Sequence, residues 1–411
     1  MTWRRVLMNG AFVFESSIYG RGAKMFRNVF GTVASAALVV AATTGFAQQT
    51  AQAEQDKTVK VNQIQVIGSH NSYHSGFAPS ERKYLETKNP KALRALDYSH
   101  APLPDQLDGG VRQIEIDVFA DAKGGRYAHL PIDDATVKAG LPADPNFDPK
   151  HEMDKPGFKV MHVQGMDERS TCHTFVKCIT VVREWSKQHP QHLPIFILVE
   201  TKEDGGKQRE GAIATEPFTK PVFDALDAEI RSVYHSGEYI TPDEVRGNAA
   251  TLNDAIRAGG WPTLEKARGK VVFLLDQRKI ETIYTDSHPS LKGRVLFTNG
   301  EPGKPDAAFT EENNGSKETI DALVKQGYLV RTRTDEGTEQ ARTNDTTRRD
   351  LALSTGAQMI STDYPPSEPS QWSSFVVKFP DGLVARCNPV NKPEGCVDRL
   401  LEAPAGTVAT K

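Results

Sequence analysis

Two carboxylates stand two positions apart in the segment RQIEIDVF, residues 112–119. Successive side chains of a β-strand point to opposite faces, so Glu115 and Asp117 would share one face while isoleucine and valine take the other. Two carboxylates side by side in an interior repel each other and lose hydration, so they require a cation or a shared proton. The pair therefore predicts a cation site if this face is buried, and a solvated outer face if it is not.

Further oxygen donors follow neighbouring apolar runs. Asn71 lies three positions after the end of the run IQVIG, and Glu200 ends the run PIFILVE. Three carboxylates with one amide oxygen suit Ca²⁺ or Mg²⁺ better than Zn²⁺, which favours nitrogen and sulfur ligands. We expect these four residues to hold one divalent cation.

Histidines accompany these oxygen donors. His70 precedes Asn71, and His162 lies in the run FKVMHV. An imidazole titrates near neutral pH, so both residues are candidates for general acid–base catalysis beside the cation. His74, His129 and His173 are interpreted as loop or supporting histidines.

The elements that must position these residues alternate along the chain. Helical spacing occurs between several of the apolar runs, at residues 174–189, 220–234, 317–327 and 338–356. Strands alternating with helices imply a parallel sheet, and eight strands predict an α/β fold of the irregular TIM-type (β/α)8 class. Such barrels place their active sites at the carboxyl ends of the strands, where the later runs end in Asp276, Asn299 and Asp363. The eight predicted strands are residues 64–68, 111–119, 158–163, 194–200, 271–276, 294–299, 328–334 and 357–364.

The start of the chain has the order of a secretory signal peptide. Lys24 and Arg27 precede an apolar, small-residue stretch, residues 29–47, and a polar linker follows. We expect cleavage after Ala47 or Ala53, and residues 1–24 are interpreted as an upstream extension of the reading frame. The sequence thus predicts a secreted or periplasmic protein with three parts: the leader and linker at 1–53, the barrel at 60–368 and an appended segment at 369–411.

The four cysteines form two close pairs in the sequence. In an exported chain this spacing predicts two short-loop disulfides, Cys172 with Cys178 and Cys387 with Cys396. A zinc site is poorly supported, because His173 is the histidine that adjoins a cysteine and no second ligand pair has the required spacing.

Composition and missing motifs exclude other functions. The chain has 411 residues with a net charge of -3, 25% charged and 38% hydrophobic residues, so it lacks the basic excess of a nucleic-acid-binding protein. It contains no Gly-rich dinucleotide fingerprint after a strand, no phosphate-binding P-loop and no G-x-S-x-G nucleophile elbow. Glycoside hydrolysis by two carboxylates stays open, although it would leave the histidine pair unexplained.

Taken together, these motifs resemble the Ca²⁺-dependent phosphatidylinositol-specific phospholipase C family, within the barrel-shaped phosphodiesterases. The resemblance spans about residues 60–368. It depends on GSHNSYH, GVRQIEIDVF, KVMHVQGMDERSTCHTF, ILVETKED, GKVVFLLD and the stretch from RTRTD to STDYP.

The resemblance implies roles for these residues. His70 and His162 match the catalytic histidines of the family, and its Ca²⁺ ligands correspond to Asn71, Glu115, Asp117 and Glu200. Cationic residues near the substrate correspond to Lys202, Arg331 and Arg333.

The implied reaction is attack of the inositol 2-hydroxyl on phosphorus, with one histidine protonating the departing diacylglycerol oxygen. Which histidine does so is left open. The expected partner is a phospholipid at a membrane or micelle surface, with no nucleic acid or protein partner and a monomeric state. The alternatives are a glycerophosphodiester phosphodiesterase or another phospholipase on the same barrel, and a catalytically inactive secreted binding protein.

Overall fold

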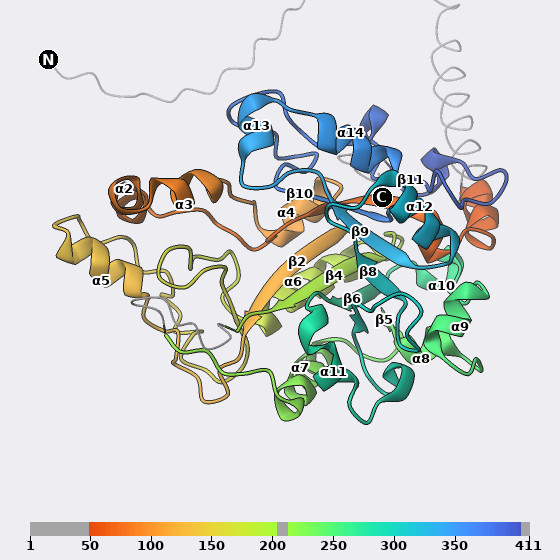
Figure 1. Cartoon of the computed structure of the whole chain (residues 1–411), viewed down its shortest axis with the longest axis horizontal. Coiled ribbons are helices and arrows are strands. Elements are labelled where there is room, and N and C mark those ends of the chain that lie inside the picture. The colour runs from red at the N-terminus through yellow and green to blue at the C-terminus, as the bar shows by residue number, and fades with distance from the viewer. Residues whose placement is uncertain (1–48, 204–212, 404–411) are drawn as a thin grey trace, which may run out of the picture. The chain divides into compact units, whose positions relative to one another are not determined.

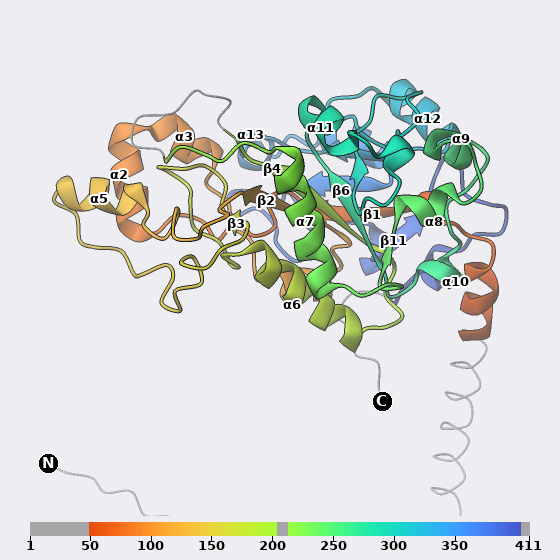
Figure 2. The same ribbon diagram turned by 90° about the horizontal axis from the view of Figure 1, so that it is seen from below.

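The computed structural model describes residues 49–203 and 213–403, and the fold lies in the second of two compact units, Ala51–Lys411. Its centre is a barrel of parallel strands (Figures 1 and 2). Around the barrel the order is β1, β2, β4, β6, β7, β8, β9 and β10, which pairs again with β1. A bridge between Asn299 and Phe309 joins β7 to β8 and completes the circle. These strands are β1 (Ile64–Ser69), β2 (Gln113–Phe119), β4 (Ile195–Thr201), β6 (Val271–Leu275), β7 (Phe297–Thr298), β8 (Phe309–Glu311), β9 (Leu329–Arg333) and β10 (Met359–Thr362).

The predicted (β/α)8 class is confirmed, and its irregularity comes from the short strands β7 and β8. β4 and β6 are buried along almost their whole length, as expected for parallel strands that are covered on both faces. Close pairing of β1 with β2 requires Gly68, because a Cβ there would lie 1.9 Å from Oε1 of Gln113. The barrel wall is therefore tight where the end of β1 meets the start of β2.

Helices connect and cover the strands. α6 and α7 pack against each other outside the barrel (Figure 2), and both confirm the helical spacing in the sequence, as does α12. The predicted helix at 338–356 is divided into α13 and α14. The α-helices are α2 (Pro79–Lys88), α3 (Pro90–Ala95), α4 (Leu103–Asp108), α5 (Pro131–Lys138), α6 (Phe175–Gln188), α7 (Lys220–Val233), α8 (Pro242–Arg246), α9 (Leu252–Arg257), α10 (Leu264–Ala267), α11 (Glu281–Thr285), α12 (Lys317–Lys325), α13 (Glu339–Thr343) and α14 (Thr347–Ser354).

One predicted barrel strand is wrong. In residues 158–163, β3 (Lys159–Val160) pairs antiparallel with the end of β2 and takes no place in the barrel. The eighth barrel strand is instead β8, which the sequence analysis did not identify. His162 consequently lies on a loop beyond β3 rather than at the end of a barrel strand.

The long connections after β1 and β2 extend to one side of the molecule. They carry α2, α3 and α5, which lie at the opposite end of the molecule from α8 and α9 in both views (Figures 1 and 2). α2 contacts both α3 and α5. These connections follow the carboxyl ends of β1 and β2, so this extension borders the end of the barrel where the parallel strands have their carboxyl ends.

Two further short strands pair with barrel strands without being part of the circle. β5 (Tyr239–Ile240) pairs with β6, and β11 (Ala385–Cys387), in the tail that follows the barrel, pairs antiparallel with β1. Within the described residues, no helix is long and apolar enough to span a membrane. The predicted signal peptide falls in residues 1–48, outside the described residues.

Candidate active site and metal centre

The acidic residues predicted from β2 and β4 converge. Strand register places Asp117 directly beside Glu200, and Glu115, Asp117 and Glu200 each offer a carboxylate oxygen within 4.8 Å of those of the other two. Asp117 is fully buried and Glu115 is 2% exposed. The shared face of β2 is therefore the interior of the barrel, and the solvated alternative does not apply.

Asn71 reaches the same region through a strained turn. Its φ of 46° lies in the left-handed region, which asparagine tolerates better than most residues. The turn is tied to β2, because the backbone N–H of Ser72 donates to the carbonyl of Glu115 at 3.0 Å and the Ser72 hydroxyl accepts from the N–H of Glu115 at 2.8 Å. Asn71 Nδ2 donates to the Tyr98 hydroxyl at 2.8 Å, while its buried Oδ1 accepts no hydrogen bond from any described residue.

These oxygens fit a hard divalent cation. Asn71 Oδ1 and Asp117 Oδ1 are buried acceptors that lack hydrogen bonds among the described residues, and three carboxylates lie together. Burial, and then the charge of Glu200, raise the pKa of Asp117 well above its usual value. A cation that neutralises this repulsion through oxygen ligands is what such a donor set requires.

Two basic side chains border the cluster. Lys202 Nζ lies 2.8 Å from Asp117 and 2.7 Å from Glu200. Arg331, which is 2% exposed, pairs directly with Glu115 and lies 3.5 Å from Glu311. Two of the three predicted substrate-binding cations, Lys202 and Arg331, therefore contact carboxylates of the cluster in this structure.

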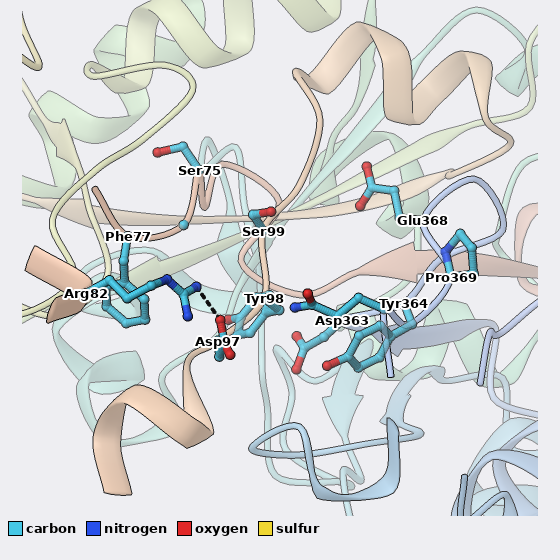
Figure 3. A pocket seen from close by; sticks show the side chains of 12 residues that line it. Ser75, Phe77, Arg82, Asp97, Tyr98, Ser99, Asp363, Tyr364, Glu368 and Pro369 are labelled. Carbon is cyan, nitrogen blue, oxygen red and sulfur yellow. Dashed lines mark hydrogen bonds and ion pairs between the residues drawn. The ribbon is translucent and has the colours of Figure 1, made fainter. Parts of the chain in front are cut away.

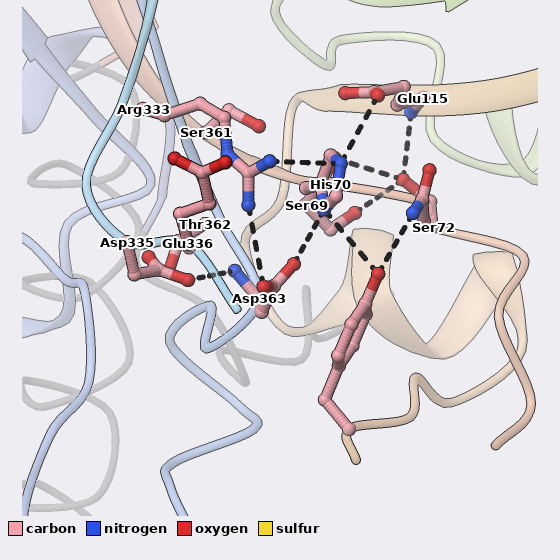
Figure 4. Close-up of polar contacts among 12 residues, drawn as sticks. Ser69, His70, Ser72, Glu115, Arg333, Asp335, Glu336, Ser361, Thr362 and Asp363 are labelled. Atoms are coloured by element: carbon pink, nitrogen blue, oxygen red, sulfur yellow. Dashed lines mark hydrogen bonds and ion pairs between the residues drawn. The ribbon is translucent and has the colours of Figure 1, made fainter. Parts of the chain in front are cut away.

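His70 lies between carboxylates and an arginine (Figure 4). Its Nδ1 is 2.7 Å from Asp363 Oδ1, and its Nε2 is 3.1 Å from Nη1 of Arg333 and 3.7 Å from Glu115. Burial, and then the charge of Arg333, lower the pKa of His70 well below its usual value. The contacts fit a neutral ring that donates from Nδ1 to Asp363 and accepts at Nε2 from Arg333.

His162 has a carboxylate partner of its own. Its Nδ1 lies 2.7 Å from Oδ2 of Asp167, and the other oxygen of Asp167 lies 2.6 Å from Nε2 of His74. His162 is 15% exposed, whereas Asp167 and His74 are buried. In addition to the larger effect of burial, a positive charge on His162 lowers the pKa of both His70 and Glu200. His162 is therefore close enough to interact electrostatically with His70 and with the acidic cluster.

A polar cavity of about 350 Å³ adjoins the His70–Asp363 pair (Figure 3). Tyr98 and Asp363 line its inner side, and an ion pair between Arg82 and Asp97 crosses its wall. The cavity offers hydrogen-bonding groups and aromatic surface within one side chain of a candidate catalytic histidine. Its other lining residues are Ser75, Gly76, Phe77, Ser99, Tyr364, Glu368, Pro369 and Gln371.

Over residues 59–389 the sequence matches the family described as "Phosphoinositide phospholipase C, Ca2+-dependent". The chain belongs to this family. It is accordingly a phospholipase C-type phosphodiesterase whose cofactor is Ca²⁺.

Similar solved structures carry related titles. One is a calcium-dependent phosphoinositol-specific phospholipase C from Pseudomonas sp, with 15% identity, coverage of 81% of this chain and 96% of that chain, and a TM-score of 0.47. Another is a Ca²⁺-dependent phosphatidylinositol-specific phospholipase C from Streptomyces antibioticus, with 18% identity, coverage of 74% and 95%, and a TM-score of 0.46. No curated protein sequence matches the chain.

The phospholipase contains both predicted disulfides. Cys172 bonds to Cys178 where α6 begins, and Cys387 of β11 bonds to Cys396. These two bonds account for all four cysteines of the sequence.

A second acidic group lies outside the barrel interior. Asp148, Glu152 and His173 offer ligand atoms within 4.8 Å of one another. Asp148 already accepts the backbone N–H groups of Glu152 and Met153, which stabilises its own loop. His173 thus keeps a supporting position, 3.8 Å from Glu152.

Sequence reasoning about the phospholipase site missed Asp167 and did not assign a role to Asp363. Asp363 follows the last barrel strand, where a polar strand end was already a signal. Asp167 lies five positions after His162 with Gly165 between them, and that spacing was the available signal.

Proposed function

We propose that this phospholipase cleaves phosphatidylinositol-type phospholipids to diacylglycerol and a cyclic or linear inositol phosphate. The observation that carries the proposal is that His70, hydrogen-bonded to the buried Asp363, lies 3.7 Å from Glu115 of the Glu115–Asp117–Glu200 cluster. His162, hydrogen-bonded to the buried Asp167, supplies the second histidine of the proposed site. Two histidines at one site can remove a proton from an attacking hydroxyl and deliver one to a leaving oxygen.

We propose that Asn71, Glu115, Asp117 and Glu200 hold the Ca²⁺. When bound, the ion lowers the pKa of a coordinated hydroxyl and offsets negative charge on the phosphoryl oxygens. Asn71 contributes an amide oxygen that has no competing donor among the described residues.

The protein's own groups would perform the proton transfers. His70 presents Nε2 at the site while Asp363 accepts from Nδ1, and His162 is held at Nδ1 by Asp167, so each ring exposes a second nitrogen. One ring takes the proton of the inositol 2-hydroxyl, and the other protonates the departing glyceride oxygen. Arg333 beside His70 and Lys202 beside the acidic cluster supply positive charge for the phosphoryl group. The polar cavity beside Asp363 offers hydrogen-bond partners for ring hydroxyls.

The test uses phosphatidylinositol vesicles with Ca²⁺ and with a chelator, and it follows cyclic inositol phosphate by phosphorus NMR. We expect product with Ca²⁺ and none with the chelator, while phosphatidylcholine vesicles and glycerophosphocholine remain uncleaved. Cleavage of glycerophosphocholine in place of phosphatidylinositol would instead establish a glycerophosphodiester phosphodiesterase. Absence of turnover on both substrates would favour a binding protein.

The histidine roles need a substrate with an activated leaving group. His70→Ala and His162→Ala should each lower the rate on phosphatidylinositol by about 10²- to 10⁴-fold. On a nitrophenyl inositol phosphate, the variant lacking the general acid should recover most of its rate, because that leaving group needs no proton. A near-normal rate for either folded variant on phosphatidylinositol would refute the role of that histidine.

We further propose that the protein is exported. Two disulfides persist best in an oxidising compartment, and the leader has the order of a signal peptide. Expression of the full chain in a bacterial host, followed by fractionation and N-terminal sequencing, should find the mature protein outside the cytoplasm with its start after Ala47 or Ala53. An intact N-terminus in the cytoplasmic fraction would contradict export.

A further inference from the structure

The loop that follows β1 and the loop that follows β3 meet beside His162. The segment after β3 turns back on itself, because Val163 and Asp167 exchange backbone hydrogen bonds of 2.8 Å in both directions around Gly165, whose φ is 77°. The segment after β1 pairs with it through a bridge between His74 and Ser170. These contacts bring His74, Asp167 and His162 together.

Asp167 binds both histidines with its two oxygens. The distances are 2.7 Å from Oδ2 to His162 Nδ1 and 2.6 Å from Oδ1 to His74 Nε2. Although burial alone would raise the pKa of Asp167, His74 and His162 hold it at about 2, so the carboxylate is ionised. An ionised carboxylate only accepts hydrogen bonds, so His74 must donate from Nε2 and His162 must donate from Nδ1.

His74 is fixed by its surroundings. It is completely buried, its ring lies 4.6 Å from that of Tyr98 and 6.3 Å from that of Phe77, and its backbone N–H donates to the Asn71 carbonyl at 2.8 Å. The ring of His162 stands at 83° to that of His74, with centroids 6.1 Å apart. A rigid buried donor therefore holds Asp167, and Asp167 in turn holds the partly exposed ring.

We propose that His74 and Asp167 are positioning residues that fix His162 in its Nδ1–H tautomer, with Nε2 directed to the reacting groups. This inference rests on the proposed function for its kinetic consequences, whereas the tautomer itself does not depend on the substrate. His74 thus takes part in the site without touching substrate, and its effect passes through Asp167.

The direct test is nitrogen NMR of the full protein labelled at histidine nitrogens. The proposal requires the pattern of a protonated Nδ1 and an unprotonated Nε2 for neutral His162, identified by its loss in His162→Ala. An Nε2–H tautomer in the wild type would overturn the proposal, even if the enzyme cleaves phosphatidylinositol.

Kinetics on phosphatidylinositol vesicles separate positioning from general stability. We expect His74→Leu to lower kcat by about 10- to 100-fold with little change in KM, as for other partners that orient a reacting group. His74→Gln should recover most of kcat, because the glutamine amide can donate to Asp167 where Nε2 did. The kcat of Asp167→Asn should fall below that of both His74 variants, since the amide NH2 replaces one of the two oxygens that accept from His74 and His162, and an NH2 group cannot accept a hydrogen bond.

The matched control is His129→Leu, which breaks an exposed histidine–aspartate pair of 2.8 Å and should leave kcat unchanged. A folded His74→Leu with normal kcat, or a His74→Gln as impaired as His74→Leu, would overturn the proposal. If His74→Leu fails to fold, Asp167→Asn and the wild-type tautomer still decide. If the wild type releases no diacylglycerol, the proposed function fails while the tautomer measurement still tests the positioning of His162.

Discussion

Replacing Asp117 by asparagine should reduce calcium binding while it leaves the calcium-free protein almost as stable as before. Asp117 is fully buried, and its neighbours Glu115 and Glu200 have carboxylate oxygens within 4.8 Å. At that distance two charges repel by about 3.5 kcal/mol at an effective dielectric constant of about 20, so two neighbours contribute about 7 kcal/mol. Lys202 at 2.8 Å offsets about 6 kcal/mol on the same basis.

The interactions with these neighbouring charges thus nearly cancel, with about 1 kcal/mol of repulsion left over, and burial adds a desolvation cost to the charge of Asp117 when no metal is bound. Asp117→Asn removes the repulsion, the attraction and the cost of burying a charge, so with a chelator its free energy of unfolding should be at most about 1 kcal/mol lower than that of the wild type. With Ca²⁺ at about 100 times its dissociation constant, the wild type should gain about 2.7 kcal/mol. If the missing carboxylate weakens binding about 100-fold, the variant should gain only about 0.4 kcal/mol.

The assay is urea unfolding of both proteins with chelator and with Ca²⁺, together with calorimetric titration of Ca²⁺. Glu152→Gln is the matched control, because it neutralises one carboxylate of the second acidic group at Asp148 and His173. This control should keep the full stabilisation by Ca²⁺. If Asp117→Asn keeps it and Glu152→Gln loses it, the calcium site is the second group and the assignment to the barrel interior is refuted.

Three further perturbations test other parts of the structure. Burial lowers the pKa of His192 to about 4 from 6.5, so its stabilising contribution is present above about pH 6.5 and is lost as pH falls toward 4. Between about pH 7 and pH 5, the free energy of unfolding of His192→Gln, measured with urea, should therefore fall by about 2 kcal/mol less than that of the wild type. Equal decreases in the two proteins would contradict this. Arg331→Met leaves Glu115 buried without its ion-pair partner and should lower the free energy of unfolding by about 3–5 kcal/mol in the same measurement. A decrease of less than about 1 kcal/mol would show that this ion pair is dispensable for stability. The double variant Cys172→Ser, Cys178→Ser opens a loop with a sequence separation of 6 and should cost about 2 kcal/mol, and unchanged urea unfolding would show that this bond does not constrain the unfolded chain.

The barrel could be predicted where single strands carry enough local signal. β4 and β6 are continuous apolar runs, and burial of both faces leaves such runs little choice of environment. β8 has three residues, too few for a period to be visible. The segment 158–163 has the composition of a strand, but its partner is the far end of β2, and pairing direction is not encoded in a short run.

The candidate site likewise has one part that follows from the order of the strands and another part that does not. His70 and Asp363 are 293 positions apart, yet β1 and β10 pair in parallel with Ser69 opposite Thr362, so the residues that follow them must be neighbours. A closed barrel therefore dictates this histidine–aspartate pair as soon as its first and last strands are known.

Asp167 depends on a different kind of information. It reaches His162 because the chain reverses at Gly165, and it reaches His74 because a bridge at Ser170 joins two loops. Neither contact follows from the order of strands, since loop pairing is decided by turn conformation and by what the loops cover. The barrel topology thus specifies the proposed metal ligands of β2 and β4 and one histidine–aspartate pair, while the loops specify the second pair. For this reason, variants of His74 and Asp167 test the part of the site that strand topology alone could not have anticipated.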